Sequence, residues 1–235
     1  MTAITDIRMP AACCAELSRR GFDIIPLPPF PQLPTPVASH PDMLIFIRNG
    51  VLLTHRDYYL LAQKELDRIA SVAGLNLVLS DETVADKYPR DVLFNVACVG
   101  THILGRKDAV SHHILKICSD TSSKFVDMRQ GYAKCSTCIV DDNTIITADT
   151  GIADAARKHG INTLKITPGH VRLDGYDTGF IGGASGCCGN TVYFCGNIDW
   201  HPDAVAIRTF CTEHGKNVVS HGDGDLLDVG TIFFL

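Results

Sequence analysis

The stretch that decides the fold is His214-Gly215-Lys216-Asn217-Val218-Val219, because three other segments repeat its order of residues. In each of them a Gly follows a run with helical spacing, and Asp or Asn comes two residues later: Arg20-Gly21-Phe22-Asp23, Ala73-Gly74-Leu75-Asn76 and His159-Gly160-Ile161-Asn162. Gly at this place is typical of a helix that ends in a left-handed residue. A fifth segment, Ser122-Ser123-Lys124, holds the same place without a Gly. The sequence therefore predicts five helix ends.

The residues on either side of each helix end repeat as well. Before it, apolar residues recur at spacings of three and four, which predicts an amphipathic helix. After it comes a short run rich in β-forming residues, which predicts an inner strand. The five runs are 23–25, 77–79, 124–126, 163–166 and 217–219.

A further strand is expected to close each unit, and four of the five closing segments carry Asp near their start. These segments are 40–46, 90–94, 132–137, 176–181 and 227–232. Pairs such as Asp142-Asn143 and Gly189-Asn190 favour tight hairpins to the next strand. We therefore expect one domain, 1–235, made of five ββαβ units at about 1–50, 51–100, 101–142, 143–190 and 191–235, with a mean length of 47 residues (235/5). Because the end units resemble the middle ones, a closed ring is favoured over an open array and over a conventional α/β sheet.

Composition limits the classes of function. The chain has 26 acidic and 21 basic residues, a net charge of −5, and no block of Lys or Arg. This charge argues against nucleic acid and acidic membrane surfaces as partners. No export signal or apolar span is recognisable, so we expect a cytoplasmic protein. No cofactor is expected, and the oligomeric state is not predicted.

Ten cysteines are interpreted as reduced thiols, because a chain of this length builds its own core. Cys135-Ser136-Thr137-Cys138 has the spacing of a redox motif, and with Cys187-Cys188 it offers a weaker zinc alternative. A packed thiol is the third interpretation of Cys135. The glycine-rich segment 182–189 is predicted to be a flexible loop near a pocket mouth. His112 and His113 are predicted to be structural residues of a helix.

The repeats and their closing segments resemble the guanidino-group-modifying enzymes, or penteins, and a bacterial family described by that fold. The resemblance implies an α/β fold, a five-bladed pseudo-fivefold β/α propeller. In those enzymes a nucleophilic Cys opens the last strand of a unit near the C-terminus, and a His-x-Asp motif lies two units earlier. Lys134-Cys135-Ser136-Thr137 and His40-Pro41-Asp42 match these motifs with the same offset, after a cyclic shift of the units.

The resemblance implies a cysteine-dependent hydrolase of the deiminase type that acts on a small guanidino or related cationic compound. Cys135 would be the nucleophile, His40 would move protons and Asp42 would orient His40 or the substrate. Asp91, Asp177 and Asp228 would bind the cation at one mouth of a central pocket. The alternative is a non-catalytic pentein that acts as a binding or interaction protein.

Overall fold

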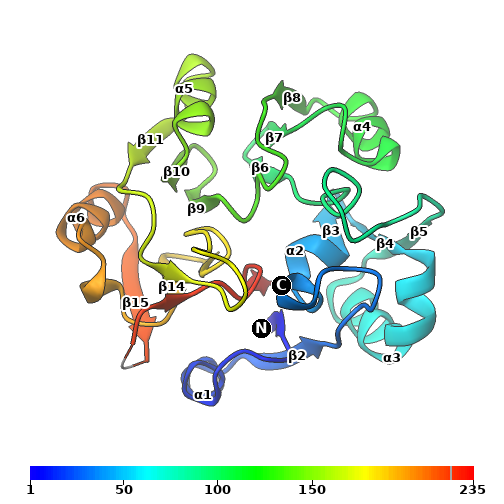
Figure 1. Ribbon diagram of the computed structural model, residues 1–235, viewed down its shortest axis with the longest axis horizontal. Coiled ribbons are helices and arrows are strands. Elements are labelled where there is room, and N and C mark those ends of the chain that lie inside the picture. The colour runs from blue at the N-terminus through cyan, green and yellow to red at the C-terminus, as the bar shows by residue number, and fades with distance from the viewer. Residues whose placement is uncertain (223) are drawn as a thin grey trace.

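The computed structural model describes residues 1–222 and 224–235, whose strands include five three-stranded sheets of one common topology (Figure 1). In each of these sheets the middle strand pairs antiparallel with one neighbour and parallel with the other. A helix connects the two parallel strands. Figure 1 shows the sheets set around a centre, with the helices on the outside.

The bounds of these elements follow the chain order. Three sheets are β3-β4-β5 (Ile45–Arg48, Val51–His55, Asn76–Ser80), β6-β7-β8 (Ala97–Val99, His102–Gly105, Lys124–Asp127) and β9-β10-β11 (Thr137–Asp141, Thr144–Thr147, Asn162–Lys165). The other two are β13-β14-β15 (Ser185–Cys188, Thr191–Cys195, Asn217–His221) and β17-β1-β2 (Phe233–Phe234, Thr2–Asp6, Asp23–Leu27). The connecting helices are α1 (Ala11–Arg19), α3 (Arg56–Ala73), α4 (His112–Ser119), α5 (Thr150–Lys158) and α6 (Ala204–Glu213). Short elements complete the fold: α2 (Pro41–Leu44), the 3-10 turns Thr35–Val37 and Ile198–Trp200, and the strand pair β12 (Val171–Arg172) and β16 (Leu226–Leu227).

Helix α3 illustrates why these sequences form these elements. Its fully buried residues Tyr58, Ala62, Leu66 and Ile69 recur at spacings of four and three, so they lie on one face against the sheet. The helix ends at Gly74, whose φ of 61° is left-handed, and the N–H of the next residue bonds back to the Ala70 carbonyl. The other three predicted glycines of this kind also have positive φ. The four Gly helix ends are therefore confirmed.

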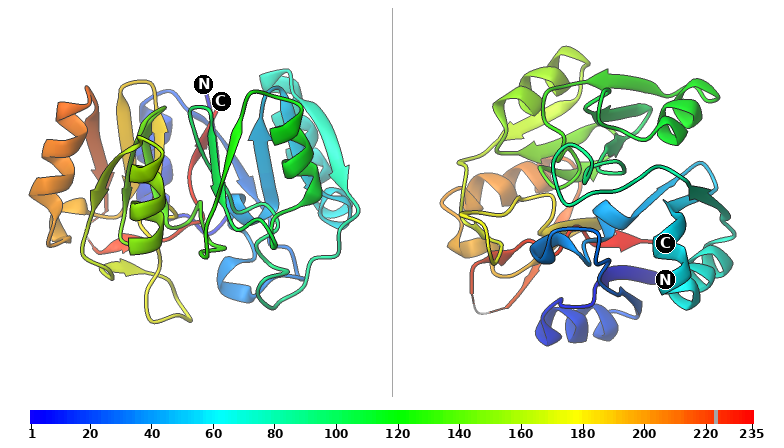
Figure 2. Two further views of the ribbon diagram at one scale, coloured as in Figure 1. Left: turned by 90° about the horizontal axis from the view of Figure 1, so that it is seen from above. Right: turned by 45° about the vertical axis from the view of Figure 1, so that its right-hand side comes forward.

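The two chain ends lie side by side because they belong to one sheet (Figures 1 and 2). Strand β17 pairs antiparallel with β1, and the N–H of Thr2 and the carbonyl of Leu235 are 3.0 Å apart. The last residues of the chain thus supply the strand that the first unit lacks.

Two of the strand predictions are wrong in position. The runs expected as inner strands form β2, β5, β8, β11 and β15, which are edge strands of their sheets. The closing segments were expected to be strands, but most of their residues lie in turns, in irregular backbone or in α2, before the antiparallel strands. Cys135 lies in such a turn, before β9. The glycine-rich segment 182–189 was expected to be a loop, but its residues Ser185–Cys188 form strand β13.

The core lies between each helix and its sheet and continues into the centre. The largest cluster of buried apolar residues joins α2, α3 and α4 to the neighbouring strands. Within the residues that the structure describes, no helix combines the length and apolar character needed to cross a membrane. The cytoplasmic location stays a prediction.

Candidate functional site

The turns that precede the antiparallel strands meet at the centre and bond to one another. We call them the turn ring; it comprises Asp42, Asn95, Lys134–Cys135, Gly182–Gly183 and Gly230–Thr231. Each turn contacts the next in chain order, and the last contacts the first. The bonds run from Asn95 Nδ2 to Asp42 O (3.4 Å), Lys134 N to Asn95 Oδ1 (2.8 Å), Gly183 N to Cys135 O (2.8 Å), Thr231 N to Gly183 O (2.8 Å) and Asp42 N to Gly230 O (3.1 Å).

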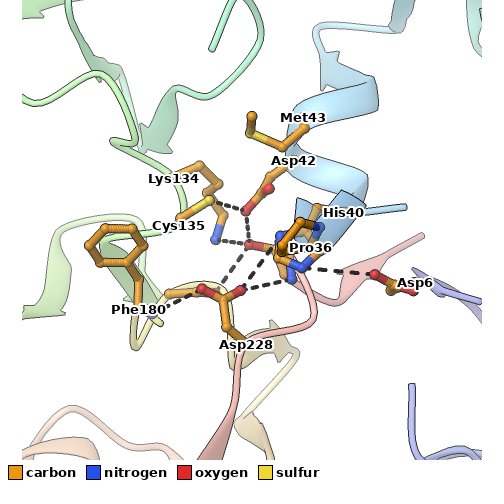
Figure 3. Close-up of polar contacts among 12 residues, drawn as sticks. Asp6, Pro36, His40, Asp42, Met43, Lys134, Cys135, Phe180 and Asp228 are labelled. Atoms are coloured by element: carbon orange, nitrogen blue, oxygen red, sulfur yellow. Dashed lines mark hydrogen bonds and ion pairs between the residues drawn. The ribbon is translucent and has the colours of Figure 1, made fainter. Parts of the chain in front are cut away.

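Cys135 is enclosed by this ring. Its Sγ contacts Asp42 Oδ2 (Figure 3), at 3.2 Å. The sulfur also accepts an N–H from Asn95 Nδ2 at 2.9 Å. Only 2% of the residue is exposed. Burial raises its pKa well above the ordinary value, and the negative charge of Asp42 raises it further. The thiol is therefore neutral at pH 7 and donates to Asp42.

A buried lysine lies on the other side of Asp42. Lys134 Nζ donates to Thr231 Oγ1 at 3.0 Å, and this hydroxyl donates to Asp42 Oδ2 at 2.8 Å. Burial lowers the pKa of Lys134, while Asp42 opposes that shift. The hydroxyl of Thr231 thus links the only two charged side chains of the turn ring, and Asp42 Oδ1 has no hydrogen-bond partner among the described residues.

His40 lies between two carboxylates, as Figure 3 shows. Its Nδ1 is 3.7 Å from Asp228 Oδ1 and its Nε2 is 3.8 Å from Asp6 Oδ2. These distances are too long for hydrogen bonds. Asp228 instead accepts the backbone N–H groups of Phe180 (2.9 Å) and Gly230 (3.0 Å). Burial raises the pKa of Asp228; His40 opposes this shift, whereas Asp42 adds to it.

Glycine is required beside Asp228. A Cβ added to Gly183 would lie 1.9 Å from Asp228 Oδ1. Because Gly183 has no side chain, its segment approaches the segment of Asp228 closely enough for the Val229 N–H to donate to the Gly183 carbonyl at 3.1 Å.

A cavity of about 320 Å³ opens beside His40 and Asp228. We call it the carboxylate cavity; its charged and ionisable lining residues are Asp6, Arg8, His40, Arg172, Asp174 and Asp228. Arg8 is committed to Asp6 and to the Thr35 carbonyl, with its Nη2 2.6 Å from Asp6 Oδ2 and its Nη1 2.8 Å from Thr35 O. Arg172 Nε lies 3.3 Å from Asp174 Oδ1. Asp228 is thus the one carboxylate of the described lining without an arginine partner.

A second cavity, of about 210 Å³, lies against the antiparallel strands. Most of its lining is apolar and comes from all five three-stranded sheets, including Ile47, Cys98, Ile139, Cys187 and Phe234. Lys134 and Thr231 of the turn ring also line it. Cys135 lines neither of these two cavities.

The structure brings together some of the predicted site residues and not others. Cys135 and Asp42 are in contact, and Asp42 is close enough to Asp228 to affect its pKa. Asp91 is buried and accepts a hydrogen bond from the Tyr132 hydroxyl, and burial raises the pKa of this carboxyl. Asp177 is exposed. Neither of these two bonds to the other predicted carboxylates within the part of the chain that the structure describes.

Sequence reasoning missed four residues of this region: Asp6, Asn95, Lys134 as a network member, and Thr231. Asn95 and Thr231 follow Asp91 and Asp228 by four and three residues, so Asn95 lies just after the segment 90–94 and Thr231 lies near the end of 227–232. The similar distance from an Asp was the available signal. Among the cysteines, Cys138 is fully buried and Cys187 Sγ donates to the Val140 carbonyl at 3.1 Å.

The chain is similar in fold to several solved structures. The chain is 12% identical to a dimethylarginine dimethylaminohydrolase solved as an adduct with S-methyl-L-thiocitrulline, covering 95% of this chain and 96% of that one with a TM-score of 0.58. It is 10% identical to the amidinotransferase SxtG of Microseira wollei (94% and 88% covered, TM-score 0.60) and 10% identical to a C. jejuni agmatine deiminase (97% and 82% covered, TM-score 0.53). These similarities show a shared fold, and the pentein fold expected from the sequence is confirmed.

A search of the curated proteins found no match. A family model does match, and it extends over residues 4–233, which include all five three-stranded sheets almost completely. The chain therefore belongs to the family of unknown function DUF6873.

Proposed function

We propose that this chain binds a small guanidino compound, or a related organic cation, in the carboxylate cavity. The observation that carries the proposal is Asp228, a buried carboxylate that lines the cavity without an arginine partner. Its two oxygens already accept backbone N–H groups, so its position is set before any ligand arrives. A fixed carboxylate is the group that best complements a planar delocalised cation.

Charge supports a cationic ligand. The cavity lining has three carboxylates and two arginines, and each arginine pairs with a carboxylate other than Asp228. His40 faces Asp228 but is 3.7 Å away, beyond hydrogen-bonding distance. A bound guanidinium would supply the missing counter-charge and lower the pKa of Asp228 toward its ordinary range.

The structural relatives support the ligand class. Their names identify proteins that act on dimethylarginine and agmatine and one that transfers an amidino group. Each of these substrates or groups has the planar amidine or guanidine unit that the carboxylate cavity would bind.

The proposal includes a closed five-bladed propeller as the scaffold, with units that meet near residues 50, 100, 142 and 190. Support comes from the cyclic hydrogen bonding of the turn ring and from the pairing of β17 with β1. In such a ring, residues from the first and last units can line one cavity, as Asp6, His40 and Asp228 do.

Calorimetric titration with agmatine, L-arginine and dimethylarginine tests the proposed binding. We expect at least one of them to bind, and Asp228→Asn to weaken that binding about tenfold or more, because the neutral amide cannot pair with a cation. Asp154→Asn is the matched control, since it removes an exposed carboxylate of α5 that does not line the carboxylate cavity. The proposal fails if none of the three ligands binds, or if both variants bind as the wild type does.

The second candidate is hydrolysis by Cys135, because the structure brings this thiol together with Asp42, the residue expected to orient the substrate. The thiolate would attack the guanidinium carbon and form a C–S bond, the C–N bond to the leaving amine would break, and His40 would protonate that amine. Water would then add to the carbon, release the urea-type product and return the thiol. This route requires Cys135 to become accessible and to ionise, and burial and Asp42 oppose both.

Thr231 also favours binding without hydrolysis. The resemblance implies a nucleophilic Cys near the C-terminus, and the C-terminal turn of this chain presents the hydroxyl of Thr231 instead. Product analysis separates the two candidates: hydrolysis predicts release of an amine or ammonia that Cys135→Ala abolishes. Binding alone predicts a titration signal with no product in either protein.

A further inference from the structure

A cluster of metal-binding side chains lies away from the turn ring, where β5 ends and α4 begins. Asp81, His112 and His113 each offer one ligand atom, and these atoms lie within 4.8 Å of one another. Asp81 Oδ1 and His113 Nε2 are 3.9 Å apart. The side chains of Asp81 and His112 are 75% and 63% exposed, so they are free to adjust their rotamers.

A partly buried polar network orients one of the two imidazoles. Glu82 Oε1 lies 3.1 Å from His112 Nδ1 and accepts the His112 backbone N–H at 3.1 Å. Its other oxygen accepts the Ser80 hydroxyl at 3.0 Å and the hydroxyl of Ser111. Metal-ligating histidines generally donate their second ring N–H to a carboxylate in this way. Such a bond leaves Nε2 of His112 as the atom with a free lone pair.

We propose that Asp81, His112 and His113 bind a divalent first-row transition metal ion of the zinc class, with Glu82 as a positioning residue. Two imidazoles and one carboxylate suit this class of ion. Around a tetrahedral zinc the ligand atoms lie about 3.3 Å apart, given metal–ligand distances near 2.0–2.1 Å. The three atoms are already within 4.8 Å, so contraction by rotamer changes of exposed side chains completes the site.

Three protein ligands leave one position of a tetrahedral ion for water or another small ligand. A cavity of about 140 Å³ adjoins the site and is lined by Asp81 and Glu82 together with His55. This site differs in place and in chemistry from the carboxylate cavity, and the two share no lining residue.

The structure extends the interpretation of the His pair. The sequence predicted His112 and His113 to be structural residues of a helix, and they are the first two residues of α4. Adjacent helical residues generally point to different sides, about 100° apart. Each of the two imidazoles nevertheless has a carboxylate from the segment after β5 beside it. Asp81 lies near His113, and Glu82 lies near His112.

Titration of the metal-free protein with Co²⁺ and Zn²⁺ tests the proposal. We expect one equivalent of each ion to bind, at least tenfold more weakly in His113→Ala and in Asp81→Asn. Glu82→Gln is expected to weaken binding about 10–100-fold. His159→Ala is the matched control and should bind as the wild type does, because it removes an exposed imidazole at another place.

The absorption spectrum of the Co²⁺ form shows whether the ion is bound by the proposed ligands or by cysteines. Ligation by nitrogen and oxygen gives visible ligand-field bands without the strong near-ultraviolet bands of thiolate ligation. Circular dichroism of each variant verifies that it is folded, and Asp81→Asn keeps the test valid if Glu82→Gln unfolds. Thiolate bands, no binding, or equal binding by the wild type and the Asp81 and His113 variants would each overturn the proposal.

Discussion

Cys135→Ala is the substitution that best tests whether this thiol is a structural or a reactive group. The wild-type Sγ is enclosed by the turn ring and contacts Asp42 and Asn95. The substitution removes one buried sulfur atom. Asp42 loses a hydrogen-bond donor, and Asn95 loses an acceptor. We therefore expect a loss of stability, which an exposed catalytic thiol would not cause.

The expected loss has two parts. Deleting one buried methyl-sized group from a packed core costs about 0.5–1.5 kcal/mol. The lost hydrogen bonding adds about 0.5–1.5 kcal/mol, because Asp42 is then left with the Thr231 hydroxyl as its side-chain partner. The total is about 1–3 kcal/mol, and with roughly 2–4 °C per kcal/mol for a chain of this length, its midpoint corresponds to about 4–8 °C in Tm.

Urea unfolding and scanning calorimetry measure this loss, with Cys135→Ser as the matched variant. Serine keeps a donor and an acceptor at the same place, so it should lose less stability than alanine. Iodoacetamide should modify wild-type Cys135 more slowly than the same thiol in urea, since burial and Asp42 raise its pKa. An unchanged Tm in Cys135→Ala, together with rapid alkylation of the native protein, would refute the structural assignment.

Four further substitutions, one of them a control, probe the fold and its charges. Gly183→Ala should destabilise the protein by about 1–3 kcal/mol or more, because the added Cβ would lie 1.9 Å from a buried carboxylate oxygen; thermal melting measures it. Leu66→Ala should cost about 2–5 kcal/mol in urea unfolding, whereas Leu60→Ala, at a residue that is 74% exposed, should change stability by less than about 0.5 kcal/mol. Burial lowers the pKa of Lys134 in the folded state, so the unfolded chain binds more protons between that pKa and the ordinary value of 10.5. The wild type should therefore gain stability relative to Lys134→Met as the pH rises through that interval, and urea titrations at several pH values would contradict this account if the difference stayed constant.

Local signals in the sequence predicted the helix end of each unit and the strand that follows it. The glycine helix ends and the β-rich runs after them depend on residues within a few positions of one another. Gly74 and the strand that starts at Asn76 are an example, since the left-handed residue ends α3 and aims the chain at β5. Such features are readable because their hydrogen bonds are short-range.

The closing segments of the units were wrongly predicted to be strands, because the turns that precede the antiparallel strands resemble strand starts in sequence. Asp42 begins a sequence with strong β-forming residues, yet Pro41–Leu44 is helical and the strand starts only at Ile45. The site residues lie in these turns, so the sequence predicted only some of them. The resemblance assigned Cys135 and Asp42 to one site, whereas the bonds from Asn95 and Thr231 span 40 and 189 residues and leave no local pattern.

The charge of Asp42 determines what a ligand would have to do to make Cys135 reactive. Two unit charges about 4 Å apart interact by about 4 kcal/mol at the effective dielectric constant of a protein near its surface. Repulsion of this size opposes a thiolate beside Asp42, and burial adds to it. A guanidinium placed between Sγ and Oδ2 would offset the negative charge of Asp42, but it would first have to separate two atoms that are 3.2 Å apart. Binding in the carboxylate cavity requires no such separation, because Asp228 lines that cavity already. A cation that binds and leaves the alkylation rate of Cys135 unchanged has therefore stopped at the cavity, whereas one that accelerates alkylation has entered the turn ring.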